Sequence, residues 1–213
     1  MADRQKVFDA DTHFQPAAES IVQFLDKAMV ARLPEFEEFK APVKTGRAGQ
    51  PIDPPWRHWY RFARGGGWGS AKPRHLGEAG PREKEERHFQ TFMGERYPTL
   101  GVEDHLLDMR IKEMDEEGID AQILVPSAFT GHTDPSVDMA FIQALNRFLD
   151  ASCSQYPERL YTMIFTSARD IPASVAEVKA WGDKKWAKGI YLDLPLDYPI
   201  DHPDLHPLWA AVD

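Results

Sequence analysis

Short, mainly apolar runs alternate along the chain with segments whose apolar residues recur at helical spacing. The apolar runs predict buried strands over residues 7–10, 119–126, 160–165 and 189–194. The helical spacing predicts amphipathic helices over residues 19–33, 106–114, 134–155 and 170–182, and a further helix opens at residue 202. Strands that are hydrophobic throughout and separated by helices are typical of a parallel sheet covered by helices. The pattern therefore predicts an α/β fold.

The order of these elements favours part of a barrel. Four βα units make half of an eightfold (β/α)8 barrel of the TIM type. An open flavodoxin-like sheet is the alternative, and it would normally carry a phosphate-binding glycine loop after the first strand. The segment at that place, DADTHFQP, contains no glycine. We expect residues 1–213 to form one partial barrel domain, with an artificial or partner-dependent boundary at Asp213, because the last helix has barely begun there.

Periodicity is lost over residues 34–98, which form a long insertion after the first strand. Its centre, PPWRHWYRFARGGGWG, is rich in proline, glycine, tryptophan and arginine. A stretch of this length without a clear element indicates a lid, a binding loop or disorder. Trp59 and Arg61 are candidates for binding a substrate through stacking and forked hydrogen bonds. Because the same residue types anchor protein interfaces, docking of a partner subunit is the alternative.

Composition and charge narrow the class of protein. The formal net charge is −9, so a phosphate backbone or an anionic membrane surface finds no general electrostatic attraction here. No apolar run approaches the roughly 20 residues that cross a bilayer. Cys153 is the single cysteine, and the N-terminal residues lack the pattern of a secretory signal. We expect a cytoplasmic protein that acts on a small molecule and binds neither nucleic acid nor membrane.

The end of the first predicted strand carries residues that could bind a metal. Asp9, Asp11 and His13 occupy every second position, so their side chains project to one side if the strand continues that far. At the carboxyl end of a barrel strand that side is the mouth, where active sites of this fold lie. A carboxylate and an imidazole suit Zn, Mn or Fe. The alternative is a polar strand end in which Asp11 caps the next segment.

The sequence resembles the amidohydrolase superfamily, in the branch that includes aminocarboxymuconate-semialdehyde decarboxylase and the resorcylate decarboxylases. The motif DADTH is similar to the first-strand signature of that branch. RIKEMDEEGIDAQILVPS, ALNRFLDASCSQYPERLYTMIFTSARDIPASVAEVKAW and GIYLDLP with DLHPLWAAVD are similar to its later helices and strands. Together these segments cover most of the chain outside residues 34–98.

This resemblance implies a divalent metal, with Zn as the first expectation and Mn or Fe as alternatives. The family usually has H-x-H on its first strand, and here Asp11 takes the place of the first histidine and His13 that of the second. The carboxylate makes the site harder and richer in oxygen. The family's remaining ligands, a histidine and an aspartate from later strands, would lie beyond Asp213. Asp193 is the candidate third ligand within the chain, with a polar loop residue as the alternative.

By resemblance, the chain is expected to be a metal-dependent hydrolase or non-oxidative decarboxylase of a small carboxylated or amide-bearing molecule. The catalytic acid or base is not identified from the sequence. His132, which follows the second strand, is a candidate for touching substrate, since loops on that face carry function. Two alternatives remain: an Fe or mixed-metal oxygenase on the same scaffold, and a non-catalytic subunit of a hetero-oligomeric complex. A homo- or hetero-oligomer is expected, because half a barrel exposes sheet edges and apolar surface.

Overall fold

The structure is a computed structural model, and it describes residues 5–14, 16–42, 58–60, 62, 107–126, 130–195 and 198–213. For His13 and Phe14 it describes the backbone alone. No helix in these ranges is long and apolar enough to cross a membrane.

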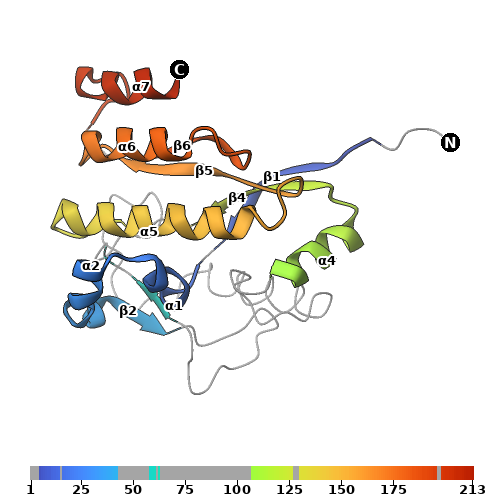
Figure 1. Ribbon diagram of the computed structural model, residues 1–213, viewed down its shortest axis with the longest axis horizontal. Helices are drawn as coiled ribbons and strands as arrows, with labels where there is room; N and C mark the ends of the chain where they lie inside the picture. The colour runs from blue at the N-terminus through green and yellow to red at the C-terminus, as the bar shows by residue number, and fades with distance from the viewer. Residues whose placement is uncertain are drawn as a thin grey trace, which may run out of the picture.

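The core of the described fold is a parallel sheet whose strands follow one another in chain order (Figure 1). Its strands are β1 (Phe8–Phe14), β4 (Ala121–Pro126), β5 (Leu160–Ser167) and β6 (Ala187–Asp193), in the order β1-β4-β5-β6. In a doubly wound flavodoxin-like sheet, the first strand would lie between the second and the third. Sequential parallel neighbours are the arrangement of a (β/α)8 barrel. The predicted α/β fold of the partial-barrel type is therefore confirmed.

Helices connect these strands as the sequence predicts. They are α4 (Leu107–Glu117), α5 (Pro135–Cys153), α6 (Ile171–Trp181) and, after the short turn η4 (Pro203–Leu205), α7 (His206–Val212). The side chain of Asp134 caps α5 by accepting the Ser136 N–H, and that of Asp170 caps α6 by accepting the Ala173 N–H. Gly118 follows α4 with a φ of 73°, a left-handed conformation that glycine adopts without strain.

Helix α5 lies between the sheet and the N-terminal helical segment (Figure 1), so it is buried on two sides. Phe141, Leu145 and Leu149 have no exposed surface, which confirms the core stripe expected from their spacing. Asn146, also fully buried, accepts the N–H of Phe165 at 2.9 Å and donates to its carbonyl at 3.0 Å. A polar side chain of α5 thus completes the backbone hydrogen bonding of β5.

The expected helix over residues 19–33 is wrong, because the structure breaks it into short turns. They are α1 (Ala18–Ile21), η1 (Val22–Phe24) and α2 (Lys27–Ala31). Leu25 is extended, with ψ at 150°, and the Asp26 side chain starts a new helix by accepting the Met29 N–H. A local cap has therefore overridden the helical spacing.

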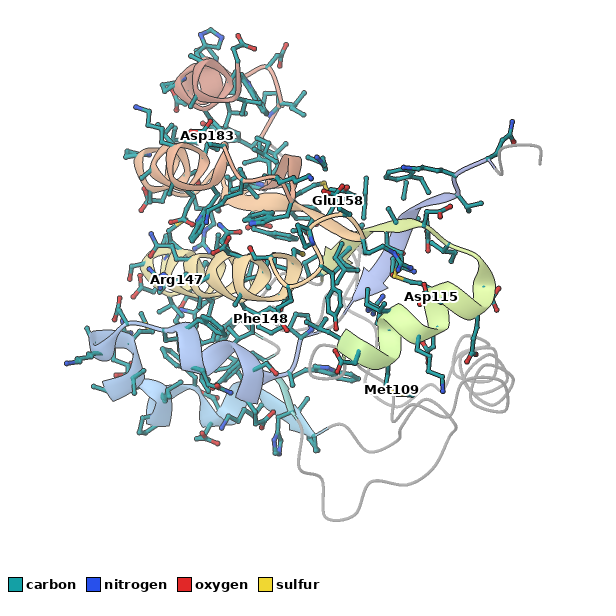
Figure 2. The ribbon with its side chains drawn as sticks, turned by 45° about the vertical axis from the view of Figure 1, so that its right-hand side comes forward. Met109, Asp115, Arg147, Phe148, Glu158 and Asp183 are labelled. Atoms are coloured by element: carbon teal, nitrogen blue, oxygen red, sulfur yellow. The ribbon has the colours of Figure 1, made fainter. Side chains whose placement is uncertain are left out.

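This break lets the N-terminal segment fold against α5. The ring of Phe24 meets that of Phe148 edge-on at 5.8 Å, and Arg147 donates to the Phe24 carbonyl at 2.8 Å. Figure 2 shows Arg147 and Phe148 on the side of α5 that faces this segment. The apolar residues predicted for one helix thus reach the core from several short turns.

The expectation that residues 34–98 lack regular elements is wrong for the part that is described. The turn η2 (Leu33–Phe39) leads into β2 (Lys40–Pro42), which pairs antiparallel with β3 (His58–Tyr60). The Glu19 carboxylate fastens this pair to α1, because it accepts the His58 N–H at 3.0 Å and contacts the His58 ring at 2.6 Å. Residues 43–57, 61 and 63–98 lie outside the described residues.

A cluster of aromatic rings joins this small sheet to α5. Phe36, Tyr60, Phe62 and Phe141 are buried, and their ring centroids lie 4.9–5.9 Å apart. Offset and edge-on ring pairs of this kind stabilise a core beyond the area that they bury. Tyr60 is therefore part of the core.

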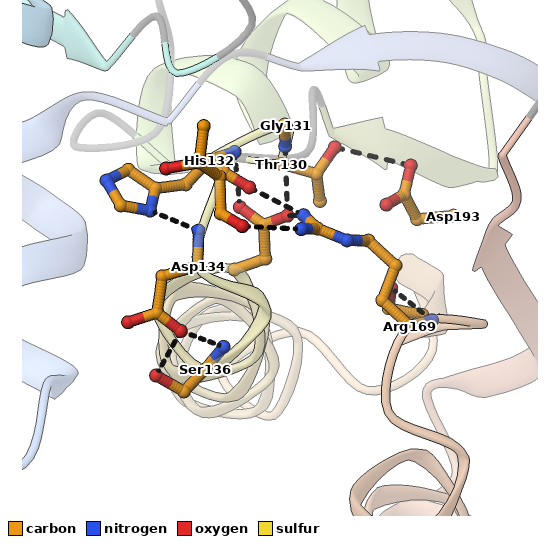
Figure 3. Close-up of polar contacts among 10 residues, drawn as sticks. Thr130, Gly131, His132, Asp134, Ser136, Arg169 and Asp193 are labelled. Atoms are coloured by element: carbon orange, nitrogen blue, oxygen red, sulfur yellow. Dashed lines mark hydrogen bonds and ion pairs between the residues drawn. The ribbon is translucent and has the colours of Figure 1, made fainter.

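A charged clamp holds the loop between β4 and α5 over the carboxyl edge of the sheet (Figure 3). The Asp138 carboxylate accepts the N–H groups of Gly131 at 3.1 Å and His132 at 2.8 Å, and it forms an ion pair with Arg169. Arg169 also donates to the carbonyls of His132 and Thr133. Only 1% of the Asp138 side chain is exposed, so the clamp is a buried charge pair completed by backbone groups.

Replacing Arg169 by leucine should destabilise the protein, because the Asp138 carboxylate stays buried without its cation. We expect the free energy of unfolding at neutral pH to fall by about 3 kcal/mol, measured by urea denaturation. Lys185→Leu is the matched control, since its ion pair with Glu158 is exposed on both sides and should contribute little. Equal losses in the two variants would contradict the assignment of the clamp.

Candidate functional site

The carboxyl edge of the sheet is where a barrel of this type carries its chemistry. The structure places Asp11 and His13 toward that end of β1, Asp193 at the end of β6, and His132 in the loop that follows β4. These are the residues that the sequence singles out, and they come from different strands. The structure shows how each is held and which of them lie together.

Strand β1 reaches the candidate ligands through a bulge. Asp9 pairs with Gln122 of β4, and Thr12 pairs with Leu124, so Ala10 and Asp11 stand opposite one residue of β4. An extra residue of this kind bends a strand and re-aims its side chains. The simple alternation that would put Asp9, Asp11 and His13 on one side is therefore interrupted, although the strand does continue through His13.

The Asp9 carboxylate fastens the bulge. One of its oxygens accepts the Asp11 N–H at 3.1 Å, and the other accepts the Thr12 hydroxyl at 2.6 Å. These contacts support the strand end locally, in the manner of an Asx turn. They agree with the interpretation of Asp9 as a support of the strand end.

Asp11 and His13 meet part of what a metal site needs. Asp11 is exposed near the carboxyl end of β1, and a carboxylate there suits a hard divalent ion. The backbone of His13 pairs with Val125, and its side chain lies outside the described residues. Within the described ranges no group of three or more ligand side chains comes together. The two residues fit a metal by chemistry and position, and their role as ligands stays a prediction.

Asp193 lies on the strand at the other edge of the described sheet. Strands β1 and β6 are the two edges of that sheet, so three strand spacings of about 4.8 Å, or roughly 14 Å along the sheet, separate them. The strands of a barrel curve around its axis, so side chains that point into the mouth approach each other more closely than this path along the sheet. The role of Asp193 as a third ligand stays a prediction.

The surroundings of Asp193 are those of a half-buried carboxyl group (Figure 3). Its Oδ1 accepts the Thr130 hydroxyl at 3.3 Å. Burial raises the pKa of this carboxyl group, and the nearby charge of Asp138 raises it further. The hydroxyl of Thr130, the charge of Arg169 and a hydrogen bond from Ser167 act in the opposite direction. The net rise favours the protonated acid more than an exposed aspartate would.

Burial also raises the pKa of Asp138, and the N–H groups of His132 and Gly131 together with Arg169 oppose that rise. The carboxyl groups of Asp138 on α5 and Asp193 on β6 thus both lie near the guanidinium of Arg169. Because a single cation serves both, the negative charge at this edge is only partly compensated.

His132 is held by the fold at both its ring and its backbone. The ring meets Phe36, Phe39 and Phe62 edge-on at centroid distances of 5.4–5.7 Å. Its Nδ1 accepts the Asp134 N–H at 3.0 Å. The described contacts give His132 a structural part in seating the insertion on the loop, and its contact with substrate stays a prediction.

The insertion holds two candidates for binding substrate, Trp59 and Arg61, and the structure describes only Trp59. Trp59 is half-buried in β3, one residue from the core residue Tyr60. Arg61 lies outside the described residues. Their role in binding substrate stays a prediction.

Two residues that sequence reasoning missed lie behind the β1 bulge. The side-chain amide of Gln122 donates to the Asp9 carboxylate at 3.4 Å, and Arg110 of α4 donates to the side-chain oxygen Oε1 of Gln122 at 3.2 Å. Both are nearly buried, with 7% and 6% of their surfaces exposed. The available signal was a glutamine inside the apolar strand AQILVP and an arginine beside the apolar stripe of α4, because buried polar residues are uncommon without a partner.

No family model matches the sequence, and no curated protein matches it. Solved structures do. An amidohydrolase from Mycobacterium avium subsp. paratuberculosis is 17% identical, with a TM-score of 0.56 over 98% of this chain and 56% of that one. 2,6-Dihydroxybenzoate decarboxylase from Rhizobium is 16% identical, with a TM-score of 0.50 over 98% of this chain and 47% of that one.

A third solved structure is 5-carboxyvanillate decarboxylase from Novosphingobium aromaticivorans, solved with bound manganese. It is 18% identical, with a TM-score of 0.51 over 97% of this chain and 47% of that one. The chain spans about half the length of the structures that it matches. At this level of identity the likeness establishes the fold, and it agrees with the resemblance drawn from the sequence: the chain has the fold of about half of a (β/α)8 barrel.

Proposed function

We propose that the chain is part of a metal-dependent decarboxylase or hydrolase that acts on a small carboxylated molecule. The observation that carries this proposal is the position of the Asp11-x-His13 motif, toward the carboxyl end of the first strand in a fold shared with decarboxylases and an amidohydrolase. Catalytic groups of such barrels come from the ends of strands.

In this proposal Asp11 and His13 supply two ligands of a divalent metal. A catalytic divalent site takes about three protein ligands and keeps one position open, so the proposal requires ligands in addition to this pair. A bound divalent ion supplies Lewis-acid polarisation of the substrate and lowers the pKa of bound water. The manganese of the 5-carboxyvanillate decarboxylase structure supports Mn beside Zn and Fe as the ion to test.

The names of the structural neighbours support a carboxylated aromatic substrate. 2,6-Dihydroxybenzoate and 5-carboxyvanillate both carry a carboxylate on a hydroxylated ring. Loss of that carboxylate as carbon dioxide is the reaction we propose first, and hydrolysis of an amide is second because one neighbour is an amidohydrolase. Trp59, Arg61 and His132 remain the candidates for holding such a ring or its carboxylate.

An oligomer is part of the proposal. Phe8 at the start of β1 is 58% exposed and Val7 before it is 45% exposed. Exposed apolar side chains at an edge strand favour association with another chain or domain.

Asp11→Asn and His13→Asn should each lower the metal content of the purified protein. Asparagine keeps the size of Asp11 but removes the charge that a divalent ion prefers. The measurement is metal analysis after loading with Mn, Zn or Fe and removal of excess metal. Asp183→Asn is the matched control and should retain the wild-type content, because Asp183 is exposed and precedes β6, at the end of the sheet away from the candidate site. Wild-type protein without metal, or equal loss in all three variants, would rule out this ligand pair.

An Asp193→Asn variant should change how stability depends on pH. The folded-state pKa of Asp193 is raised above its ordinary value of 3.8, so the unfolded chain loses this proton first as the pH rises. The contribution of Asp193 to wild-type stability therefore decreases from pH 3.8 upward until its folded-state pKa is passed. The variant lacks this decrease and should melt higher than wild type near neutral pH, with the gap closing below pH 3.8. A gap that does not vary with pH would contradict the raised pKa.

Metal-loaded protein should release carbon dioxide from a hydroxylated benzoate, and the Asp11→Asn variant should not. The assay follows carbon dioxide with 2,6-dihydroxybenzoate and 5-carboxyvanillate, with an aryl amide and an oxygen electrode in parallel. Amide cleavage alone would assign hydrolysis. Oxygen consumption by the iron-loaded protein would instead support the oxygenase alternative and overturn the proposed reaction.

A further inference from the structure

The bulge of β1 creates a need for local support. An inserted residue disrupts the ladder between two strands, so its backbone groups must find other partners. Asp11 is part of this insertion, and its N–H is bonded to the Asp9 carboxylate at 3.1 Å. The conformation of the candidate ligand Asp11 therefore depends on where that carboxylate sits.

The position of Asp9 is in turn fixed from two directions. The Thr12 hydroxyl donates to Oδ2 at 2.6 Å from the far side of the bulge, and the Gln122 amide donates to the same oxygen from β4. A short hydrogen bond to a carboxylate is among the stronger ones in a protein. Asp9 is thus tied to the strand on both sides of Asp11.

The chain of contacts continues into α4. Arg110 donates to the side-chain oxygen Oε1 of Gln122, so the glutamine amide connects a buried cation to the Asp9 carboxylate. This arrangement orients the amide, with its NH2 group toward the negative charge and its oxygen toward the positive one. In a low-dielectric setting such a chain strengthens each of its hydrogen bonds.

We propose that the Asp9 carboxylate fixes the bulge of β1 and thereby positions Asp11 and His13 as metal ligands. Thr12 and Gln122 are positioning residues in this scheme, because they act on the ligands through Asp9. The inference rests on the proposed metal site. Groups that orient metal ligands typically change metal affinity by 10- to 100-fold when they are removed.

The experiment compares Thr12→Val, which removes the hydroxyl but keeps the side-chain shape, with Thr12→Ser, which restores a hydroxyl. Thr162→Val is the matched control, since Thr162 also donates a hydroxyl hydrogen bond, to the Leu124 carbonyl at 2.9 Å, and lies outside this chain of contacts. Two quantities are measured on the full chain. They are the affinity for Mn2+ alone, from the spectroscopic signal of free Mn2+, and the exchange rate of the Asp11 amide proton by NMR.

Thr12→Val should weaken Mn2+ binding about tenfold or more, Thr12→Ser should restore it, and Thr162→Val should leave it unchanged. The Asp11 amide should exchange about tenfold faster in Thr12→Val than in wild type. Wild-type affinity in Thr12→Val, or the same loss in Thr162→Val, would overturn the positioning role. If the wild type takes up no Mn2+, the proposed metal pair fails, and the exchange rate alone decides whether Asp9 and Thr12 hold the bulge: an unchanged rate overturns that as well.

Discussion

The divergence of β4 and β5 toward their carboxyl ends is the constraint on which the described fold depends. Their pairing ends at Leu124 and Thr162, and beyond that point the backbone of β5 needs other partners. Asn146 of α5 supplies them by bonding both polar groups of Phe165, and the Glu177 carboxylate of α6 accepts a hydrogen bond from the same amide at 2.8 Å. The splayed edge that carries the candidate site is therefore held open by the helices beneath it, rather than by the sheet itself.

A second departure from regular strand pairing occurs at β1, and there too side chains bond the backbone groups that the neighbouring strand does not. There the extra residue is accommodated by side chains of β1 itself, chiefly the Asp9 carboxylate, with support from Gln122. In both places a polar side chain takes the place of a ladder hydrogen bond, and it bonds backbone groups that the neighbouring strand does not reach. The clamp of Asp138 and Arg169 does the same for the loop after β4.

The sequence predicts most of the sheet and its helices because burial sets their pattern. The mainly apolar runs become β4, β5 and β6, and Asp134 and Asp170 cap the helices that follow the first two of these. The apolar spacing predicted one helix over residues 19–33, but the cap at Asp26 outweighed that spacing and started a new helix. The spacing also did not indicate the strand pair β2 and β3, because this pair is stabilised by aromatic residues that are distant in sequence. In the candidate site the sequence identified Asp11 and His13 but not Gln122 and Arg110, because their part depends on contacts between elements far apart in sequence.

The arrangement places two kinds of carboxyl group along one edge of the sheet. Asp11 is exposed toward the carboxyl end of β1, beside the predicted metal position, whereas Asp193 at the end of β6 is half-buried, and burial raises its pKa. Burial raises the pKa of Asp138 as well, and Arg169 opposes the rise at both groups. The edge therefore changes in character from one strand to the next, because a carboxylate in contact with water stands on β1 and two carboxyl groups gather around one guanidinium beside β6.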